Sequence, residues 1–403
     1  MPKAGVVPLM VRPLPAALAA VLGAVCLPAA AGSIIRAKVT DAGPGQRLVP
    51  IRGHGNTGTQ EYLDFDASGF GAHPGRLSMR AASGGGLVVL GPPAVGQVAR
   101  RVVERGSAAR IIRDGRGRLS GHLGETPADF GVAAEDAVIQ GLPAWVIAPP
   151  SSGSTDVWVI HVHGLGSSRS QCLRGVAAFT ALGYTSLLPA YRTSLDLSPA
   201  PVRSHLGASE WKDIEAARRY ALDHGARRIL FAGWSLGASI VLRTVEQLPA
   251  ESTPGVLLIS PALDWPGIIA AQLRRAGCPG FLARRLPHTV NLVRPRGEPV
   301  LRWQDMPGTP AHKPLNIPTL ILHGTQDRSV PVELSRAFVS RHSRSAELVE
   351  FEGAHHTLEW NSAPEVWNAA VQSWCRKLEL GGSLPAAGPR RADAGVDPER
   401  TGR

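Results

Sequence analysis

Lysine and cysteine are both scarce in this chain of 403 residues. Lysine accounts for only five of the 43 basic residues, so arginine carries almost all of the formal net charge of +11. Arginine dominance beside abundant alanine, glycine and proline is what a GC-rich genome produces, and no recognised nucleic-acid-binding module is present. The charge therefore predicts a solvated basic surface, with no nucleic acid as a partner.

The four cysteines are too few and too scattered for a disulfide framework. None belongs to a CxxC pair, and no histidines stand at zinc-ligand spacing from them. Cys172 and Cys375 fall within helical apolar patterns, which favours buried free thiols. We therefore expect no metal site and no cofactor. With 44% hydrophobic and 19% charged residues, the chain is neither a disordered tail nor a polytopic membrane protein.

Residues 1–36 are typical of a targeting segment. Lys3 and Arg12 give a positive start, and the stretch 13–33 contains no charge. Its centre resembles a signal-peptide core, with a small-residue cleavage site at Ala29-Ala30-Ala31. The uncharged stretch is also just long enough to span a bilayer. The sequence thus predicts a cleaved signal peptide or a membrane anchor, and export to the cell envelope, with an ordinary N-terminal helix as the alternative.

The rest of the chain changes character twice. Residues 37–130 are dense in glycine and arginine and have short strand-like bursts, which predicts a small β-rich region without recognisable chemistry. In 131–380, strands alternate with helical patterns, which predicts an α/β fold with a mostly parallel sheet and helices on both faces. The alternation is interrupted at 262–316. Residues 381–403 are polar and are predicted to be a disordered tail.

A GxSxG pattern, Gly233-Trp-Ser-Leu-Gly237, stands between an expected strand over 228–233 and an expected helix from Leu236 to Gln247. The pattern alone is weak, but this strand–turn–helix context is the one that presents a nucleophile. Glycines permit a turn too sharp for larger residues. The turn would lift the Ser235 hydroxyl above the strand ends and aim a helix N-terminus at it, which favours developing negative charge.

A nucleophilic serine needs a base, and the base needs a carboxylate that orients it. Asp327 follows an expected strand over 318–322, and two histidines, His355 and His356, follow the expected last strand at 346–351. All these positions fall at the carboxyl ends of strands, where α/β folds place their ligands. The order Ser, Asp, His is the one that this architecture uses.

On these motifs, residues 135–378 resemble the α/β-hydrolase superfamily, of the serine esterase and peptidase type. The resemblance is narrower to bacterial members whose last loop has Gly-Ala-x-His followed by Glu-Trp-Asn. It implies that His356 is the catalytic base and Asp327 the acid. His355, in a variable position of the motif, is the alternative base, and Asp264 is the alternative acid.

The turn His163-Gly-Leu-Gly166 follows a strongly apolar strand at 157–163. A turn of this kind can present the backbone N–H of Leu165 opposite that of Leu236, so that both stabilise an oxyanion. For the side chains of His161 and His163, a purely structural role is favoured over a chemical one.

The segment 262–316 lies where relatives of this fold carry a lid. Its basic residues could recruit an anionic substrate or contact anionic lipid headgroups, but an ordinary solvated surface is the favoured role. Trp234, Trp265 and Trp303 are expected in the core, with an apolar pocket as the alternative. The eight basic residues of the segment are Arg274, Arg275, Arg284, Arg285, Arg294, Arg296, Arg302 and Lys313.

The resemblance implies a serine hydrolase that cleaves carboxylic esters through an acyl-enzyme, acting on a small-molecule ester or amide. Cleavage of an amide or peptide bond is the main alternative, and a non-catalytic envelope protein that binds a ligand on a hydrolase scaffold is the third. Serine at the sharp turn argues against haloalkane dehalogenases and epoxide hydrolases, which need a carboxylate nucleophile. Membrane association through the N-terminal segment is a further expectation.

Overall fold

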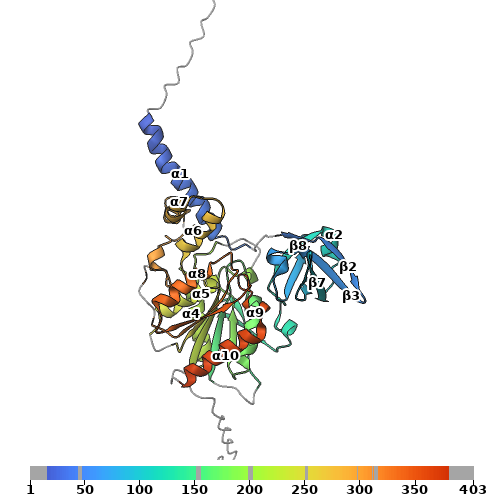
Figure 1. The fold of residues 1–403 in the computed structure, drawn as a ribbon. Helices are drawn as coiled ribbons and strands as arrows, with labels where there is room; N and C mark the ends of the chain where they lie inside the picture. Colours follow the sequence, from blue (N-terminus) through green and yellow to red (C-terminus); the bar gives the residue numbers. More distant parts are fainter. Residues whose placement is uncertain are drawn as a thin grey trace, which may run out of the picture.

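The computed structural model describes two sheets, a long N-terminal helix and a cap of short helices (Figure 1). The predicted tail 381–403 and the first 15 residues of the predicted targeting segment lie outside the described residues. The structure describes residues 16–43, 48–150, 156–197, 203–249, 253–296, 298–310, 312 and 316–380.

The larger sheet has eight strands in the order β16-β15-β14-β13-β11-β12-β10-β9. All pairs from β16 to β12 are parallel, and only β10 and β9 run antiparallel at one edge. Its inner strands are near-continuous apolar runs because both faces are covered. The mostly parallel sheet is thus confirmed. The strands are β9 (Glu135–Ile139), β10 (Leu142–Ile147), β11 (Val157–Val162), β12 (Thr185–Pro189), β13 (Arg228–Trp234), β14 (Val256–Ile259), β15 (Thr319–Gly324) and β16 (Ala346–Phe351).

Helices cover both faces of this sheet, as predicted. One buried cluster joins the sheet to α4 (Trp211–Asp223), α5 (Leu236–Glu246), α6 (Trp265–Arg275) and α8 (Val332–Arg341). The other joins it to α3 (Leu173–Thr180) and α10 (Pro364–Leu380). A short helix, α9 (Glu359–Ser362), precedes α10. The two layers fix the sheet, so loops at the carboxyl ends of its strands meet at one edge.

The smaller sheet confirms the β-rich N-terminal region, and its described pairs are all antiparallel. Its own core holds Arg101, which is fully buried and donates hydrogen bonds to the carbonyls of Gly71, His73, Gly75 and Gly91. These bonds fix the loop that contacts the larger domain. The elements are β1 (Leu48–Pro50), β2 (Gly53–Thr57), β3 (Gln60–Asp66), β4 (Leu77–Ala81), β5 (Val88–Leu90), β6 (Ala94–Val95), β7 (Val98–Arg105), α2 (Ala109–Asp114) and β8 (Arg116–Ser120).

The segment 262–316 folds into α6, α7 (Gly280–Arg285) and the short 3-10 helices η7 (Leu286–Thr289) and η8 (Trp303–Asp305). The N-terminal helix α1 (Ala16–Val39) packs on η7, where a Cβ at Gly32 would overlap the backbone of Thr289. Within the described residues, no helix is both long enough and apolar enough to cross a membrane.

The tryptophans Trp234, Trp265 and Trp303 are all buried in core clusters. Trp303 donates its indole N–H to the Pro287 carbonyl over 2.9 Å, and Trp265 donates to Ser239 Oγ over 3.3 Å. Trp303 thereby joins η8 to η7, and Trp265 joins α6 to α5, so the expected core packing of the three tryptophans is confirmed.

Candidate active site

The turn between β13 and α5 carries Ser235 in a conformation that L-residues rarely adopt, with φ 53° and ψ −113°. A Cβ at Gly233 would lie 2.7 Å from the Cα of Ala238, and one at Gly237 would overlap the Val162 carbonyl. Both glycines are therefore required by the close approach of backbone segments. Such a backbone conformation costs roughly 1–3 kcal/mol and persists only where its surroundings enforce it.

Backbone hydrogen bonds hold the turn in place. The Ser235 N–H donates to the Ile259 carbonyl over 2.9 Å, and the Ser235 carbonyl accepts from the Ala238 and Ala262 N–H groups, each over 3.1 Å. The first ties the turn to the next strand of the sheet. Because the turn is fixed on both sides, the Ser235 side chain has a defined position at the carboxyl edge of the sheet.

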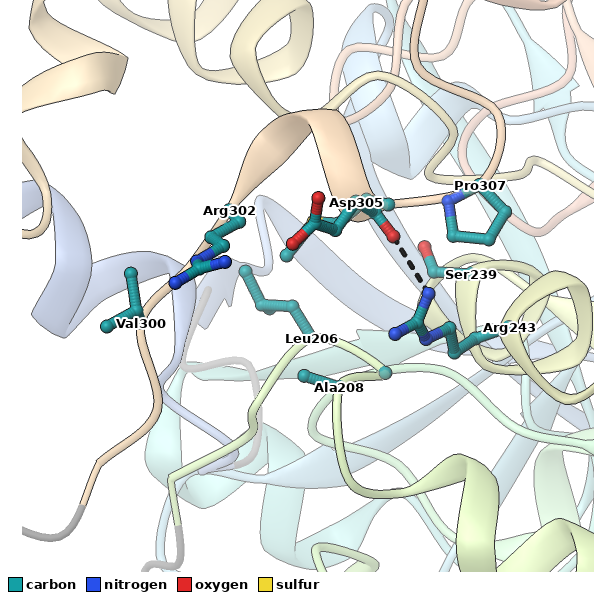
Figure 2. Close-up of a pocket in the computed structure, with 10 residues that line it drawn as sticks. Leu206, Ala208, Ser239, Arg243, Val300, Arg302, Asp305 and Pro307 are labelled. Carbon is teal, nitrogen blue, oxygen red and sulfur yellow. Dashed lines mark hydrogen bonds between the residues drawn. The ribbon is translucent and has the colours of Figure 1, made fainter. Parts of the chain in front are cut away.

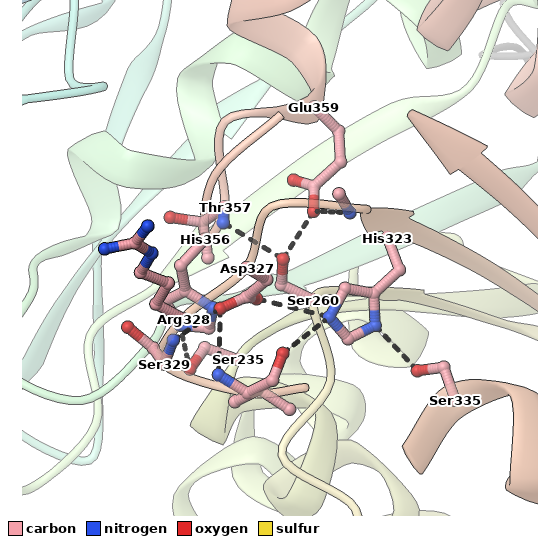
Figure 3. A network of polar contacts seen from close by, with 12 residues as sticks. Ser235, Ser260, His323, Asp327, Arg328, Ser329, Ser335, His356, Thr357 and Glu359 are labelled. Atoms are coloured by element: carbon pink, nitrogen blue, oxygen red, sulfur yellow. Dashed lines mark hydrogen bonds and ion pairs between the residues drawn. The ribbon is translucent and has the colours of Figure 1, made fainter. Parts of the chain in front are cut away.

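Ser235, His356 and Asp327 form one hydrogen-bonded chain (Figure 3). His356 Nε2 lies 2.9 Å from Ser235 Oγ, and His356 Nδ1 lies 2.6 Å from Asp327 Oδ2. A carboxylate only accepts, so Nδ1 carries the proton and Nε2 is free to accept from the serine hydroxyl. The three residues predicted from chain order are thus brought together from three separate loops.

The Asp327 carboxylate has all its oxygen sites occupied. Oδ1 accepts from the backbone N–H groups of Ser329 and Val330 at 2.7 and 2.8 Å, while Oδ2 faces His356 and, at 3.2 Å, His323 Nε2. Burial alone would raise the pKa of Asp327, but the charges and hydrogen bonds of the two histidines outweigh it and hold the pKa well below its usual value. Asp327 is therefore ionised at any ordinary pH.

The contact with Asp327 also shifts the pKa of His356. Burial lowers the pKa of the imidazole, but the charge of Asp327 and its hydrogen bond outweigh burial, so that the net shift is upward. The carboxylate thus favours the protonated imidazolium.

Two buried groups support this chain and have no counterpart among the residues singled out from the sequence. His323 Nε2 faces two acceptors, Asp327 Oδ2 and the Val330 carbonyl at 3.0 Å, so it carries a proton and Nδ1 accepts from Ser335 Oγ at 2.7 Å. The signal for it was present, because His323 stands four residues before Asp327 at the end of a strand. It locks the loop after β15.

The other group is Glu359, which is fully buried. Its Oε1 accepts from the Gly324 N–H at 3.0 Å and from Ser260 Oγ, and Ser260 Oγ in turn accepts from the Thr357 N–H at 3.0 Å (Figure 3). Burial raises the pKa of this carboxyl. Glu359 thereby ties the loop that carries His356 to the ends of β14 and β15. It belongs to the Glu-Trp-Asn of the last loop, which was recognised as a motif without a role for its residues.

His355 and Asp264, the alternative base and acid predicted from the sequence, contact other groups. His355 Nδ1 is 3.3 Å from His73 Nδ1, on the smaller domain. Asp264 caps α6, with its side chain accepting from the Gly267 N–H at 3.1 Å. The structure therefore brings neither residue into the chain that contains Ser235.

The loop after β11 runs beside Ser235. A Cβ at Gly164 would lie 3.2 Å from Ser235 Cβ, and the loop is held by the Gly164 N–H, which donates to Gln171 Oε1 over 2.7 Å. Among the contacts of the described residues, neither the Leu165 nor the Leu236 N–H donates a hydrogen bond. Both amides predicted for the oxyanion are thus available.

The side chains of the two histidines of this strand and loop lie in other contacts. His163 stacks on Tyr191, and His161 bonds Ser186 Oγ at 3.1 Å.

Ser235 and His356 open into a cleft of about 480 Å³ between the two domains. None of the described residues that line it belongs to 262–316, so the expected lid does not cover this cleft. The smaller domain forms that wall instead, with an apolar part and a basic part. Residues that it contributes are Phe70, Arg80, Leu87, Arg118, Leu119, Ser120, Gly121, His122, Gly124 and Glu125.

In the part of the chain that the structure describes, the basic part of the wall holds one cation without an opposite charge. Arg80 pairs with Glu125, whereas Arg118 forms no ion pair with any described residue. Burial, reinforced by nearby cations, lowers the pKa of His122 to about 3, so this histidine is neutral. Arg118 therefore gives the cleft a net positive charge.

A smaller cavity, of about 130 Å³, lies between the loop at 206–208, α5 and the segment 300–307 (Figure 2). Arg243 crosses it and donates to the Asp305 carbonyl over 3.1 Å. Neither Ser235 nor His356 lines it, so the cleft at the domain boundary is the candidate site.

A family model described as the alpha/beta hydrolase family matches residues 159–370. The chain belongs to the alpha/beta hydrolase family. The match contains the whole chain of Ser235, His356 and Asp327, and the smaller domain lies outside it. In this alpha/beta hydrolase, a wall of the cleft is therefore built by a region that the family model does not include.

Similar solved structures include an esterase of Pyrococcus furiosus, with 22% identity over 63% of this chain and 96% of that chain and a TM-score of 0.47. A serine hydrolase of Xanthomonas campestris, described as being without a lid, has 18% identity over 64% of this chain and 97% of that one, with a TM-score of 0.44. Est1E of Butyrivibrio proteoclasticus has 19% identity over 61% of this chain and 99% of that one, with a TM-score of 0.43.

Proposed function

We propose that this alpha/beta hydrolase is a serine hydrolase that cleaves carboxylic esters through an acyl-enzyme. The observation that carries the proposal is the unbroken chain Ser235–His356–Asp327, which stands on a strained turn and faces a cleft. A scaffold that only binds a ligand has no reason to retain all three side chains in this geometry. This argues against the alternative of a non-catalytic envelope protein.

In the first half of the reaction, Ser235 Oγ attacks the carbonyl carbon of the ester while its proton moves to His356 Nε2. The negative charge then lies on the former carbonyl oxygen, where the amides of Leu165 and Leu236 stabilise it. Asp327 stabilises the imidazolium. Collapse of the tetrahedral intermediate breaks the bond to the alcohol oxygen, which takes the proton from His356 and leaves.

In the second half, a water molecule gives a proton to His356 Nε2 and attacks the acyl carbon. Collapse then returns the proton to Ser235 Oγ and releases the carboxylic acid. The same residues would also attack an amide or a peptide bond, so the bond type is settled by comparing ester and amide substrates that share one acyl group.

The proposal is tested by labelling the full chain with a fluorophosphonate and locating the adduct by mass spectrometry. We expect one phosphonate per chain, on the peptide that contains Ser235, together with a burst of p-nitrophenol from a short p-nitrophenyl ester. A folded chain that neither takes the label on Ser235 nor hydrolyses esters or amides would reject the enzyme and leave ligand binding as the function.

The raised pKa of His356 predicts the pH dependence. Protonated imidazole cannot accept the serine proton, so kcat/KM falls as the pH decreases through the pKa of His356. Because that pKa is raised, we expect the midpoint of this acid limb above the usual histidine value of about 6.5. A pH profile of kcat/KM on a neutral ester measures it. A midpoint below the usual value of about 6.5 would contradict the assigned environment of His356.

The unpaired Arg118 predicts a preference for a negatively charged acyl group. We expect Arg118→Gln to lower kcat/KM for the p-nitrophenyl hemiester of succinate about tenfold, because a charge-assisted contact is lost. The p-nitrophenyl ester of butyrate, which has no charge, should be affected less than about twofold. Arg116→Gln, an exposed arginine on the same strand β8 that does not line the cleft, is the matched control. Equal losses on both esters in Arg118→Gln would contradict charge recognition.

A further inference from the structure

Exposed apolar side chains gather on α1, α7 and the loop that follows η7. Leu27 on α1 is 72% exposed, Phe281 on α7 is 66% exposed and Leu292 in the loop is 60% exposed. Single exposed apolar residues are ordinary, but a group of them on one face marks a site of interaction. The exposed apolar side chains of these elements are Leu27, Ile34, Phe281, Leu282, Leu292 and Val293.

These side chains belong to one packed unit. Helix α1 packs on η7, and α7 packs on both α6 and η7. The buried Arg36 donates to Glu298 Oε2 over 2.8 Å and to the Pro299 carbonyl over 2.7 Å, so α1 is joined to the loop that carries the apolar residues. Figure 1 shows α1 extending outward from the body beside α6 and α7. The exposed apolar side chains therefore belong to elements that pack on one another, and we define the face as the outer surface of these elements.

The apolar residues stand among exposed arginines. Among the described residues, none of these arginines forms an ion pair with an acidic side chain, and Glu298, in the same segment, pairs with Arg36 and Arg203. A face that combines guanidinium groups without ion pairs and exposed apolar side chains is complementary to the surface of an anionic membrane, where negative headgroups lie over the acyl chains. The arginines are Arg274, Arg284, Arg285, Arg294 and Arg296, whereas Arg275 donates to the Arg328 carbonyl and Arg302 lines the cavity of Figure 2.

We propose that this face docks on a lipid bilayer that contains anionic lipids. The guanidinium groups would lie among the headgroups, and Phe281, Leu292 and their apolar neighbours would enter the boundary with the acyl chains. Because the uncharged residues 16–33 belong to α1, which packs on the same elements, one side of the molecule is suited to a bilayer. The docking is independent of the proposed catalytic role of Ser235.

The proposal predicts how substitutions weaken membrane binding. Each arginine near an anionic surface strengthens binding about fivefold, so Arg284→Gln/Arg285→Gln should weaken it on the order of 25-fold. Phe281→Ser should weaken it about tenfold through lost apolar burial. Neither change touches the cleft, so hydrolysis of a soluble ester should be unchanged.

Binding of the full chain is measured by co-sedimentation with two kinds of vesicle. One contains phosphatidylcholine alone, and the other contains phosphatidylcholine with about 30% phosphatidylglycerol, which gives it a negative surface potential. Matched controls come from exposed positions away from this face, on α10 and in the loop after α8, with α10 at the opposite end of the molecule in Figure 1. Arg344→Gln/Arg376→Gln removes two exposed arginines there, and Val366→Ser removes a side chain that is 57% exposed.

A second measurement reports contact of the face itself, even where the N-terminal segment alone holds the chain on vesicles. Cys278 lies between α6 and α7 and is half-buried, whereas Cys172 and Cys375 are buried. In a Cys26→Ser background, an environment-sensitive dye on Cys278 should shift its emission to the blue only with anionic vesicles. The shift should be lost in Arg284→Gln/Arg285→Gln and kept in both controls.

Three results would overturn the proposal. The first is a dye on Cys278 that gives no shift although the chain is bound, since the N-terminal segment would then be the sole contact. The second is equal binding by the face variants and the α10 controls. The third is a concentration-dependent dimer without vesicles that Phe281→Ser dissociates, because a second copy of the chain would then be the partner of this face.

Discussion

Replacing Ser235 with alanine should reduce kcat for ester hydrolysis on the order of 10⁴- to 10⁶-fold and abolish fluorophosphonate labelling. The loss is this large because the attacking oxygen itself is removed, whereas His356 and Asp327 act only through it. KM should change little, since the substrate is held by the walls of the cleft and not by the Ser235 hydroxyl. Steady-state kinetics with a p-nitrophenyl ester and titration with the label measure both effects.

The fold should survive this change. Alanine keeps the backbone of the turn, whose hydrogen bonds to Ile259, Ala238 and Ala262 come from the main chain, and only the contact with His356 is lost. The matched control is Ser340→Ala, at an exposed position on α8. It should retain full activity and labelling. A Ser235→Ala chain that keeps more than about 1% of kcat would show that another group is the nucleophile.

The turn at Ser235 could be predicted because its geometry depends on residues that are close together in the sequence. Gly233 and Gly237 mark two positions where backbone segments touch, and the flanking periodicities specify a strand before the turn and a helix after it. Asp327 and His356 could be placed for a related reason. In a parallel sheet the carboxyl ends of all strands share one edge, so residues that follow different strands converge without any long-range information.

The wall of the cleft could not be predicted in this way. It depends on contacts between parts of the chain that are far apart, such as Asn361 Nδ2 donating to the Gly121 carbonyl over 3.0 Å across 240 residues. No local pattern encodes such a pairing. The position of the segment 262–316 suggested a lid, but the smaller domain, and not that segment, lines the cleft beside Ser235.

The burial of Glu359 could not be predicted from the sequence, for a different reason. A glutamate at the start of a helix normally indicates a solvent-exposed first turn, so Glu359 gave no sign that it is buried. Its role follows only from the loops that close over it, which bring the Gly324 N–H and Ser260 Oγ to the same carboxylate oxygen. The position of His323, four residues before Asp327 at a strand end, is visible in the sequence, but its partners Val330 and Ser335, in the loop and helix beyond Asp327, are not.

Replacing Asp327 with asparagine should lower kcat about 10⁴-fold while the chain remains folded. The surroundings fix how the new amide lies. Ser329 and Val330 both donate to the Oδ1 position, so the amide oxygen must stay there and the NH₂ group must take the place of Oδ2. That group donates toward His356 Nδ1, so the imidazole carries its proton on Nε2, where it can no longer accept the proton of Ser235.

The substitution should also move the pH profile. With the carboxylate gone, burial dominates and lowers the pKa of His356, so the acid limb of the residual activity should shift to lower pH than in the wild-type chain. A variant that was merely misfolded would lose activity at every pH without moving the limb. This shift therefore separates the loss of an orienting charge from a loss of structure.

The matched control is Asp264→Asn, because Asp264 is the other acid that the sequence offered. It caps α6 through a hydrogen bond from the Gly267 N–H, and asparagine caps a helix about as well as aspartate. We therefore expect kcat and the pH profile to stay within about twofold of wild type. If Asp264→Asn lost as much activity as Asp327→Asn, the acid of the site would have to be assigned anew.

His323 adds to the expected contrast, because its Nε2–H also faces the Oδ2 position and would oppose an NH₂ group there. No such second donor, among the described residues, contacts the carboxylate of Asp264 besides the Gly267 N–H.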